Sequence, residues 1–247
     1  MKHVVGVIVA MPQEAYALFG RLGWSRQGGF PAKAERFKDL LAMVVISGQG
    51  EERSRKAAQF LLDSDPLFIL NLGVAGALVK DMESGDLLVP AHVTDGTTRI
   101  GLSSQVHNYL KQLISVQGVG FKEGLLVSTK KVVSSPDAKV ELHRTTGALA
   151  VDMEAHGVAV ACSQSDTPLF VAKSIIDSIS QPLPREITSC LTATGQVRFV
   201  HFLMTILSKP WLLARLIEMQ HSFKAAVFSL EQVKSILSAN ISLKAIA

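Results

Sequence analysis

The sequence contains few of the residues that build disulfide frameworks or metal centres. Cys162 and Cys190 are the only cysteines among 247 residues, and neither a C-x-x-C spacing nor another paired pattern is present. The seven histidines form no H-x-x-x-H pair, and the G-x-S-x-G elbow of serine hydrolases does not occur. We therefore expect a reduced, cytoplasmic protein whose chemistry needs no metal and no organic cofactor.

Aromatic residues and long apolar runs are also scarce. Aromatics make up 6% of the chain and the 25 Lys and Arg residues are dispersed, so the net charge of +4 does not indicate nucleic-acid binding. No run of 18 or more uncharged apolar residues occurs, and the first residues lack a signal-peptide cleavage pattern, so we expect no spanning segment. The positive charge fits an anionic small ligand or a membrane surface equally well.

Short apolar runs rich in β-branched residues recur along the first 180 residues, and such runs are typical of strands buried on both faces. Helical patterns over residues 13–22, 51–62 and 154–163 alternate with them. This alternation predicts a three-layer α/β/α sandwich with a central mixed β-sheet, in a catalytic domain of residues 1–195. The expected strands are His3–Ala10, Leu40–Ser47, Phe68–Gly73, Asp86–Pro90, Gly124–Ser128, Ala148–Met153 and Leu169–Ile176.

Residues 196–247 have a different pattern. Apolar residues recur at intervals of three and four from Trp211 to Leu237, directly after Pro210, which predicts amphipathic helices. We expect these helices to pack on the same domain. The alternatives are packing on a second subunit, or peripheral contact with the inner face of a membrane, with Arg215 and Lys224 near lipid phosphates.

A glycine-rich turn, Gly48-Gln49-Gly50, follows the second expected strand. A dinucleotide site is not indicated, because Arg53 occupies the third glycine position and no acid stands at the ribose-binding offset. Two interpretations remain. One is a tight turn from strand to helix, and the other is a backbone nest for an anion, with Gly48, Gly50 and Arg53 as phosphate partners.

Three acidic residues, Glu14, Glu154 and Asp177, stand where strands are expected to end. Each alone is also explained as an acid favoured at a helix N-terminus by the helix dipole. Together they fit one reaction, the cleavage of a nucleoside's glycosidic bond. That reaction needs a proton for the departing base, a guided nucleophile and polar groups on the ribose hydroxyls.

Six segments resemble, in order and spacing, the motifs of the purine nucleoside phosphorylase and methylthioadenosine/adenosylhomocysteine nucleosidase superfamily. Val151-Asp152-Met153-Glu154 is the most specific part, and the segments cover most of residues 3–180. The resemblance implies a homo-oligomeric enzyme that cleaves the N-glycosidic bond of a purine nucleoside, with adenine as the base. The segments are AMPQEA (10–15), SGQGEERSRKAA (47–58), NLGVAGAL (71–78), GDLLVP (85–90), LAVDMEAHGVAVA (149–161) and KSIIDS (173–178).

The resemblance also implies residue roles. Asp177 matches the acid that protonates, or hydrogen-bonds, N7 of the purine, and Glu14 matches the carboxylate that orients water in hydrolytic members. Glu154 matches the acid on the ribose hydroxyls, and Met153 matches the residue packed on the sugar. The loop bordering the nucleophile matches Val74, Ala75 and Gly76.

Three departures from the family pattern leave the nucleophile and the substrate open. Val74 and Ile176 replace serines, and Lys173 stands where many relatives have arginine. Residues 143–161 and 209–227 are similar to the hopanoid-associated phosphorylase branch, which implies phosphorolytic release of adenine from lipid-linked adenosylhopane in hopanoid biosynthesis. The alternatives are a hydrolase of methylthioadenosine-like or adenosylhomocysteine-like substrates and a catalytically inactive nucleoside-binding or lipid-binding relative.

Overall fold

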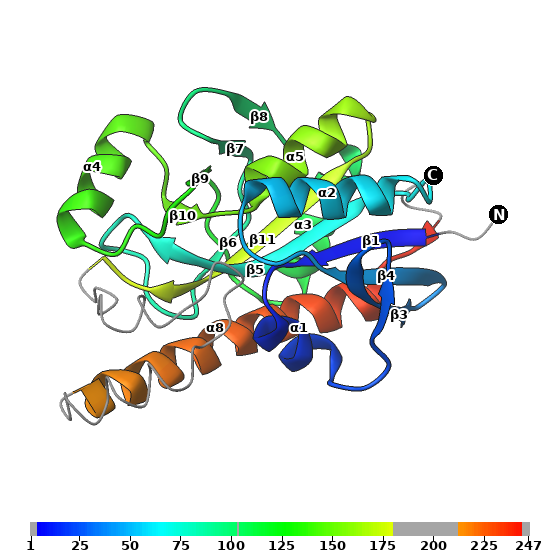
Figure 1. The fold of residues 1–247 in the computed structure, drawn as a ribbon, viewed down its shortest axis with the longest axis horizontal. Coiled ribbons are helices and arrows are strands. Elements are labelled where there is room, and N and C mark those ends of the chain that lie inside the picture. Colours follow the sequence, from blue (N-terminus) through cyan, green and yellow to red (C-terminus); the bar gives the residue numbers. More distant parts are fainter. Residues whose placement is uncertain (1–3, 103, 180–211, 244–247) are drawn as a thin grey trace.

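A computed structural model of the chain describes residues 4–102, 104–179 and 212–243, which form a layered α/β fold (Figure 1). Their 11 strands belong to one mixed sheet. The strands are β1 (Val4–Val9), β2 (Ser25–Gln27), β3 (Phe30–Phe37), β4 (Leu40–Ile46), β5 (Ile69–Ala77), β6 (Leu87–Leu88), β7 (His92–Thr94), β8 (Arg99–Gly101), β9 (Leu125–Ser128), β10 (Ala150–Asp152) and β11 (Leu169–Asp177). The helices are α1 (Pro12–Phe19), α2 (Glu51–Leu62), α3 (Gln105–Val116), α4 (Pro136–Thr146), α5 (Ala155–Gln164) and α8 (Leu212–Asn240).

The sheet has the order β2-β3-β4-β1-β5-β10-β9-β7-β8, and β11 pairs with β5 and β6 beside this path. The central strands β4, β1, β5 and β11 run parallel, whereas β3 pairs antiparallel with β4 and β10 antiparallel with β5. The predicted mixed sheet is therefore confirmed. The strand β1 ends beside Leu72, halfway along β5, and β11 ends beside Gly76, so both carboxyl ends lie along the second half of β5.

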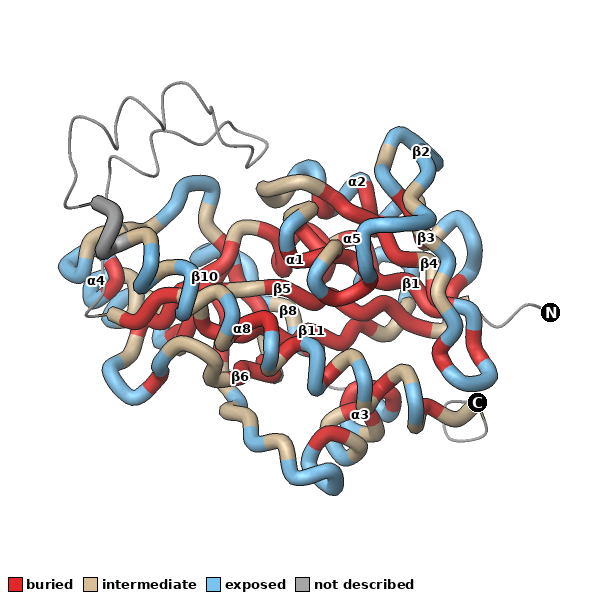
Figure 2. The backbone as a smooth tube through the Cα atoms, turned by 90° about the horizontal axis from the view of Figure 1, so that it is seen from below, coloured by how far each residue is buried: buried red, intermediate tan, exposed pale blue. Residues whose placement is uncertain are grey.

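Helices cover both faces of the sheet because side chains of the central strands alternate between them. In β5, Leu70 and Leu72 pack with α1, α3 and α8, whereas Ile69 and Ala75 pack with α2 and α5. Figure 2 shows the resulting concentration of buried residues in the central strands. The predicted three-layer arrangement follows from this alternation.

The helix α8 forms part of the layer below the sheet. Its second half buries Leu230, Val233 and Leu237 against α1, α3 and β11. A single helix of 29 residues is therefore present where amphipathic helices were predicted, and its second half packs on the sheet and its helices. The domain boundary at residue 195 lies outside the described residues, as does the side chain of Arg215. In the described ranges no helix has the length and apolar character needed to cross a membrane.

Several elements differ from the sequence-based expectation. The first helix ends at Phe19 rather than at residue 22, and β5 continues past Gly73 to Ala77. The helices α3 and α4 and the hairpin of β2 and β3 were not predicted. In α4 the termini do carry signals: Ser135 accepts a hydrogen bond from the Ala138 N–H as N-cap, and Gly147 ends the helix with φ 71°.

The helices α2 and α5 approach each other closely at Gly157. A Cβ atom on this residue would lie 2.3 Å from the Glu51 carbonyl oxygen and 2.8 Å from the Ser54 Oγ. The backbone carbonyl cannot move without displacing α2, so this contact requires glycine.

We therefore expect Gly157→Ala to lower the free energy of unfolding by about 1–3 kcal/mol, the usual effect of overpacking. Urea denaturation of both proteins measures the difference. Gly120→Ala is the matched control, because a Cβ on Gly120 would meet no heavy atom within 4 Å. Equal stability of the two variants would contradict the role given to Gly157.

Candidate active site

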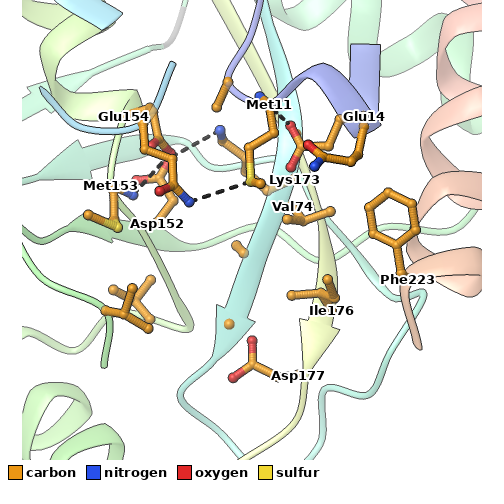
Figure 3. Close-up of a pocket in the computed structure, with 18 of the residues that line it drawn as sticks. Met11, Glu14, Val74, Asp152, Met153, Glu154, Lys173, Ile176, Asp177 and Phe223 are labelled. Atoms are coloured by element: carbon orange, nitrogen blue, oxygen red, sulfur yellow. Dashed lines mark hydrogen bonds and ion pairs between the residues drawn. The ribbon is translucent and has the colours of Figure 1, made fainter. Parts of the chain in front are cut away.

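A cavity of about 470 Å³ opens at the sheet edge where β1, β10 and β11 end (Figure 3). The structure brings together seven of the predicted site residues around it. Met153 and Glu154 follow β10, Glu14 lies in the first turn of α1, and Asp177 ends β11. The other three, from β5, are Val74, Ala75 and Gly76.

Glu14 is almost fully enclosed, with 2% of its surface exposed. Its Oε2 accepts a hydrogen bond from the Met11 N–H at 3.4 Å. Burial raises the pKa of Glu14 to about 7, although the Lys173 ammonium and the backbone hydrogen bonds from Met11 and Val74 act in the opposite direction. A carboxyl with that pKa exchanges a proton near neutral pH, as a general base must.

Lys173 lies between the carboxyl groups of the site. Its Nζ is 3.0 Å from the Asp152 Oδ2, and both side chains are 1% exposed. Burial lowers the pKa of Lys173, but Asp152 and the neighbouring glutamates more than offset this, so that the pKa is raised and the amine stays charged. A Cβ on Gly73 would lie 3.3 Å from this Nζ and 3.4 Å from the Glu14 Oε2, so Gly73 leaves room for both groups.

The Asp152 carboxyl group accepts hydrogen bonds from two further donors. Its Oδ1 accepts a hydrogen bond from the Ser128 Oγ at 2.5 Å, and its Oδ2 accepts one from the Ala155 N–H at 3.0 Å. Three donors, including Lys173, therefore hold this carboxyl group, and Asp152 in turn fixes the position of the Lys173 ammonium.

Glu154 is the N-cap residue of α5, and its carboxyl group is also held by backbone donors. Its Oε1 accepts from the Gly50 N–H at 2.9 Å, and its Oε2 accepts from the Met153 N–H at 3.2 Å. Burial raises the pKa of Glu154 to about 7, and the charge of Asp152 adds to this. The carboxyl can therefore accept or share a proton with a hydroxyl placed in the cavity.

These contacts change the interpretation of the glycine-rich turn. The nest predicted for an external anion binds a carboxylate of the protein itself, through the Gly50 N–H. Of the turn, Gln49 lines the cavity. Arg53 is exposed, with its guanidinium beside Gly48 rather than at the cavity. Gly50 therefore contacts one of the acids, whereas Gly48, Gly50 and Arg53 are not among the residues that line the cavity. Their role as phosphate partners stays a prediction.

Asp177 lies at the opposite side of the cavity from Glu154 (Figure 3). A Cβ on Gly76 would be 2.9 Å from its Oδ1, so the carboxyl lies directly over this glycine. Lys139 of α4 binds its Oδ2. Burial raises the pKa of Asp177 to about 6, and Lys139 limits the rise.

Lys139 is a site residue that the sequence analysis missed. It lies 38 residues from Asp177, on a helix whose other residues are mostly polar and exposed. Nothing local distinguishes it from a surface lysine. Ser135 and Gly147, which cap α4, could have predicted the helix, but they do not show which way the Lys139 side chain points.

Apolar side chains form the remaining walls. Val74 and Ile176, which replace serines of the family pattern, face the cavity beside Phe223 (Figure 3). The first half of α8 adds Leu216 and Met219. The site therefore combines buried carboxyl groups with an extended apolar wall. In the described ranges, no group of three or more His, Cys, Asp or Glu residues is arranged to hold a metal ion.

The layered fold, with a cavity lined by carboxyl groups at the strand ends, defines an α/β enzyme class, and comparisons with known proteins identify the superfamily. A family model described as the phosphorylase superfamily matches residues 4–191, so the chain belongs to this superfamily. The 5′-methylthioadenosine/S-adenosylhomocysteine nucleosidase of Buchnera aphidicola subsp. Baizongia pistaciae is 27% identical over 196 residues, covering 70% of this chain and 78% of the relative. A Staphylococcus aureus enzyme of the same name is 25% identical, covering 70% and 86%.

Solved structures give the same fold. A futalosine hydrolase mutant of Helicobacter pylori matches with a TM-score of 0.64 and 25% identity, covering 70% of this chain and 89% of that one. The 5′-methylthioadenosine/S-adenosylhomocysteine nucleosidase of the same organism matches with a TM-score of 0.71 and 22% identity, covering 96% and 98%. The predicted superfamily is confirmed, whereas the hopanoid-associated branch stays a prediction.

The raised pKa of Glu14 predicts a dependence of stability on pH. Its ordinary pKa of 4.5 rises to about 7 in the folded protein, so the folded state binds a proton more tightly than the unfolded chain. The stability gained from this proton is present below pH 4.5 and is lost as the pH rises through about 7. Glu14→Gln removes the titration, and we expect it to raise the free energy of unfolding by roughly 2–3 kcal/mol at about pH 8.

The gain should shrink at about pH 5, where the folded protein already carries the proton. Thermal unfolding of both proteins at the two pH values measures it. Glu52→Gln is the control, because Glu52 is exposed and pairs with Lys56 on the surface of α2. A gain that is equal at both pH values would show that the carboxyl group of Glu14 is not the cause.

Proposed function

We propose that this protein hydrolyses the N-glycosidic bond of an adenine nucleoside that carries a large apolar substituent at its 5′ position. One observation carries the proposal. Glu14, Glu154 and Asp177 line a single cavity, each with a raised pKa, and an apolar wall continues from them. These are the groups that proton transfer to the base, nucleophile guidance and sugar binding require.

The proposed reaction uses each acid once. Asp177 gives its proton to N7 of the purine while the bond between the anomeric carbon and N9 breaks, so the base departs as neutral adenine. Glu14 accepts a proton from a water molecule, whose oxygen bonds to the anomeric carbon of the oxocarbenium-like sugar. Glu154 accepts hydrogen bonds from the ribose hydroxyls. The products are adenine and the free sugar.

The charges around Glu14 favour water over phosphate as the nucleophile. Glu14, Asp152 and Glu154 surround the single ammonium of Lys173, and Asp152 already pairs with it at 3.0 Å. A phosphate dianion placed there would meet carboxyl groups at short range in a buried site, where repulsion is strong. Hydrolytic relatives, the two nucleosidases and the futalosine hydrolase, give further support.

The apolar wall supports an apolar 5′ substituent. Val74 and Ile176 remove two hydroxyl groups that the family pattern supplies, and Phe223 and Met219 extend the surface along α8. Apolar side chains gain free energy by covering an apolar group, at roughly 25 cal/mol per Å². A lipid-linked adenosine fits this wall, and we propose adenosylhopane, the substrate of the branch that the sequence resembles.

Hydrolysis and phosphorolysis are distinguished by one assay. The purified protein is incubated with an adenosine bearing a long 5′-alkylthio group, with and without inorganic phosphate, and adenine is measured by chromatography. We expect release at equal rates in both samples, with the free sugar as co-product. Release that requires phosphate and yields a sugar 1-phosphate would establish the phosphorolysis that the sequence resemblance implies. Binding without release would favour an inactive relative.

The role of Asp177 is tested by Asp177→Asn in the same assay. The amide N–H is far too weak an acid to transfer a proton to N7, so we expect adenine release to fall by about 100-fold or more. Circular dichroism and the melting temperature check that the fold is kept. Unchanged release would remove Asp177 from the mechanism.

A further inference from the structure

Lys139 is a buried charge that the proposed reaction does not yet use. Its side chain is 1% exposed, and that of its partner Asp177 is 9% exposed. Besides the Asp177 Oδ2, its Nζ bonds the Ser178 carbonyl oxygen at 3.0 Å and the Asp177 carbonyl oxygen at 3.3 Å. The three acceptors belong to Asp177, the last residue of β11, and to Ser178, which follows it. Lys139 therefore holds both the backbone and the side chain of Asp177.

Anchoring of α4 alone does not explain a lysine at this position. Lys139 is the one residue of α4 that is buried. An apolar side chain would anchor the helix at lower desolvation cost, because replacing a buried ion pair by apolar residues is often neutral or stabilising. The charge of Lys139 therefore has a use that an apolar anchor would not supply.

The position of Lys139 is fixed by the local structure of α4. Ser135 caps the helix, Pro136 occupies its first turn, and the Lys139 N–H donates to the Ser135 carbonyl oxygen at 3.0 Å. These constraints place Lys139 one turn into the helix, with Asp177 between it and the cavity. Lys139 itself does not line the cavity, whereas Asp177 does.

We propose that Lys139 is a positioning residue for departure of the base: it holds Oδ2 of Asp177, leaves Oδ1 for N7 of the purine, and stabilises the carboxylate that remains after proton transfer. This inference rests on the proposed function. In the step, the Oδ1 proton of Asp177 moves to N7, and the electron pair of the glycosidic bond moves into the purine. Lys139 stays protonated throughout and compensates the charge left on Asp177.

The electrostatics agree with this assignment. Burial raises the pKa of Asp177 to about 6, and the charge and hydrogen bond of Lys139 keep it from rising further. Without Lys139 the carboxyl would hold its proton more firmly and become a weaker acid toward N7. The other described charged groups that line the cavity with Asp177 are Glu14 of α1, Asp152 of β10, Glu154 at the start of α5 and Lys173 of β11.

The test compares two leaving groups on the same 5′-alkylthio ribose. Adenine needs a proton at N7 to depart, whereas 4-nitrophenolate departs as an anion without one. For Lys139→Met we expect kcat for the adenine nucleoside to fall by about 100-fold, and kcat for the nitrophenyl riboside to stay within about threefold. The basic limb of the pH profile of kcat/KM for the adenine nucleoside should move to higher pH, because Asp177 keeps its proton longer.

Two further variants separate charge from packing. Lys139→Gln keeps hydrogen-bond donors near Asp177 without the charge, and we expect the same selective loss from it. It replaces Lys139→Met as the test should that variant not fold. Lys139→Arg keeps the charge and should restore adenine release to within about tenfold. Lys111→Met is the matched control: it breaks the ion pair of Lys111, on α3, with Glu123, and it should leave kcat unchanged for both substrates.

The outcomes distinguish this inference from the proposed function. Equal losses for both leaving groups, or an unmoved pH profile, would show that Lys139 is only structural and would overturn the inference alone. Failure of the unchanged protein to release adenine would overturn the proposed function, and the assignment of Lys139 with it.

Discussion

The ion pair of Lys173 with Asp152 is the interaction on which the polar half of the cavity depends. Several carboxyl groups are buried within reach of one another, and charges of one sign in a low dielectric repel strongly. Asp152 is fixed by Ser128 and by the Ala155 N–H, and it presents Lys173 to the glutamates. The ammonium is the compensating charge that lets Glu14 and Glu154 remain close to ionisation at neutral pH rather than being fully protonated.

The burial of these carboxyl groups also lowers the stability of the folded protein. A carboxyl group that must ionise in a buried place destabilises the folded state above its pKa. The surrounding sheet tolerates this because its central strands are buried on both faces and well packed, as at Val7 and Leu70. The apolar core supplies the free energy that holds the acids in place, and the acids supply the chemistry. The stability of the fold therefore comes from the apolar core, and the proposed activity comes from the buried acids.

The sequence predicted the central strands because their β-branched runs are a direct consequence of burial on both faces. The sequence did not predict that β5 continues from Gly73 to Ala77. Gly and Ala, which make up most of this stretch, have weak strand preference, and pairing with β11 keeps the stretch extended. The predicted acids Glu14, Glu154 and Asp177 do line one cavity, since each stands at or just after the end of a strand. Lys139 could not be found, because its partner is 38 residues away and a lysine among polar neighbours indicates a surface position. The sequence left open whether the glycine-rich turn is a tight turn or an anion nest, because it does not show that the Glu154 carboxyl group accepts a hydrogen bond from the Gly50 N–H.

The C-terminal helix α8 belongs to two environments at once. Its first half borders the cavity with Leu216, Met219 and Phe223, and its second half is embedded in the core through Leu230 and Leu237. A helix is a stiff rod, so a molecule that fills the cavity against the first half also restrains the second. Ligand binding in the cavity should therefore slow hydrogen exchange of the backbone amides in the second half of α8. By reciprocity, any partner that loosens the end of this helix lowers the affinity for the ligand.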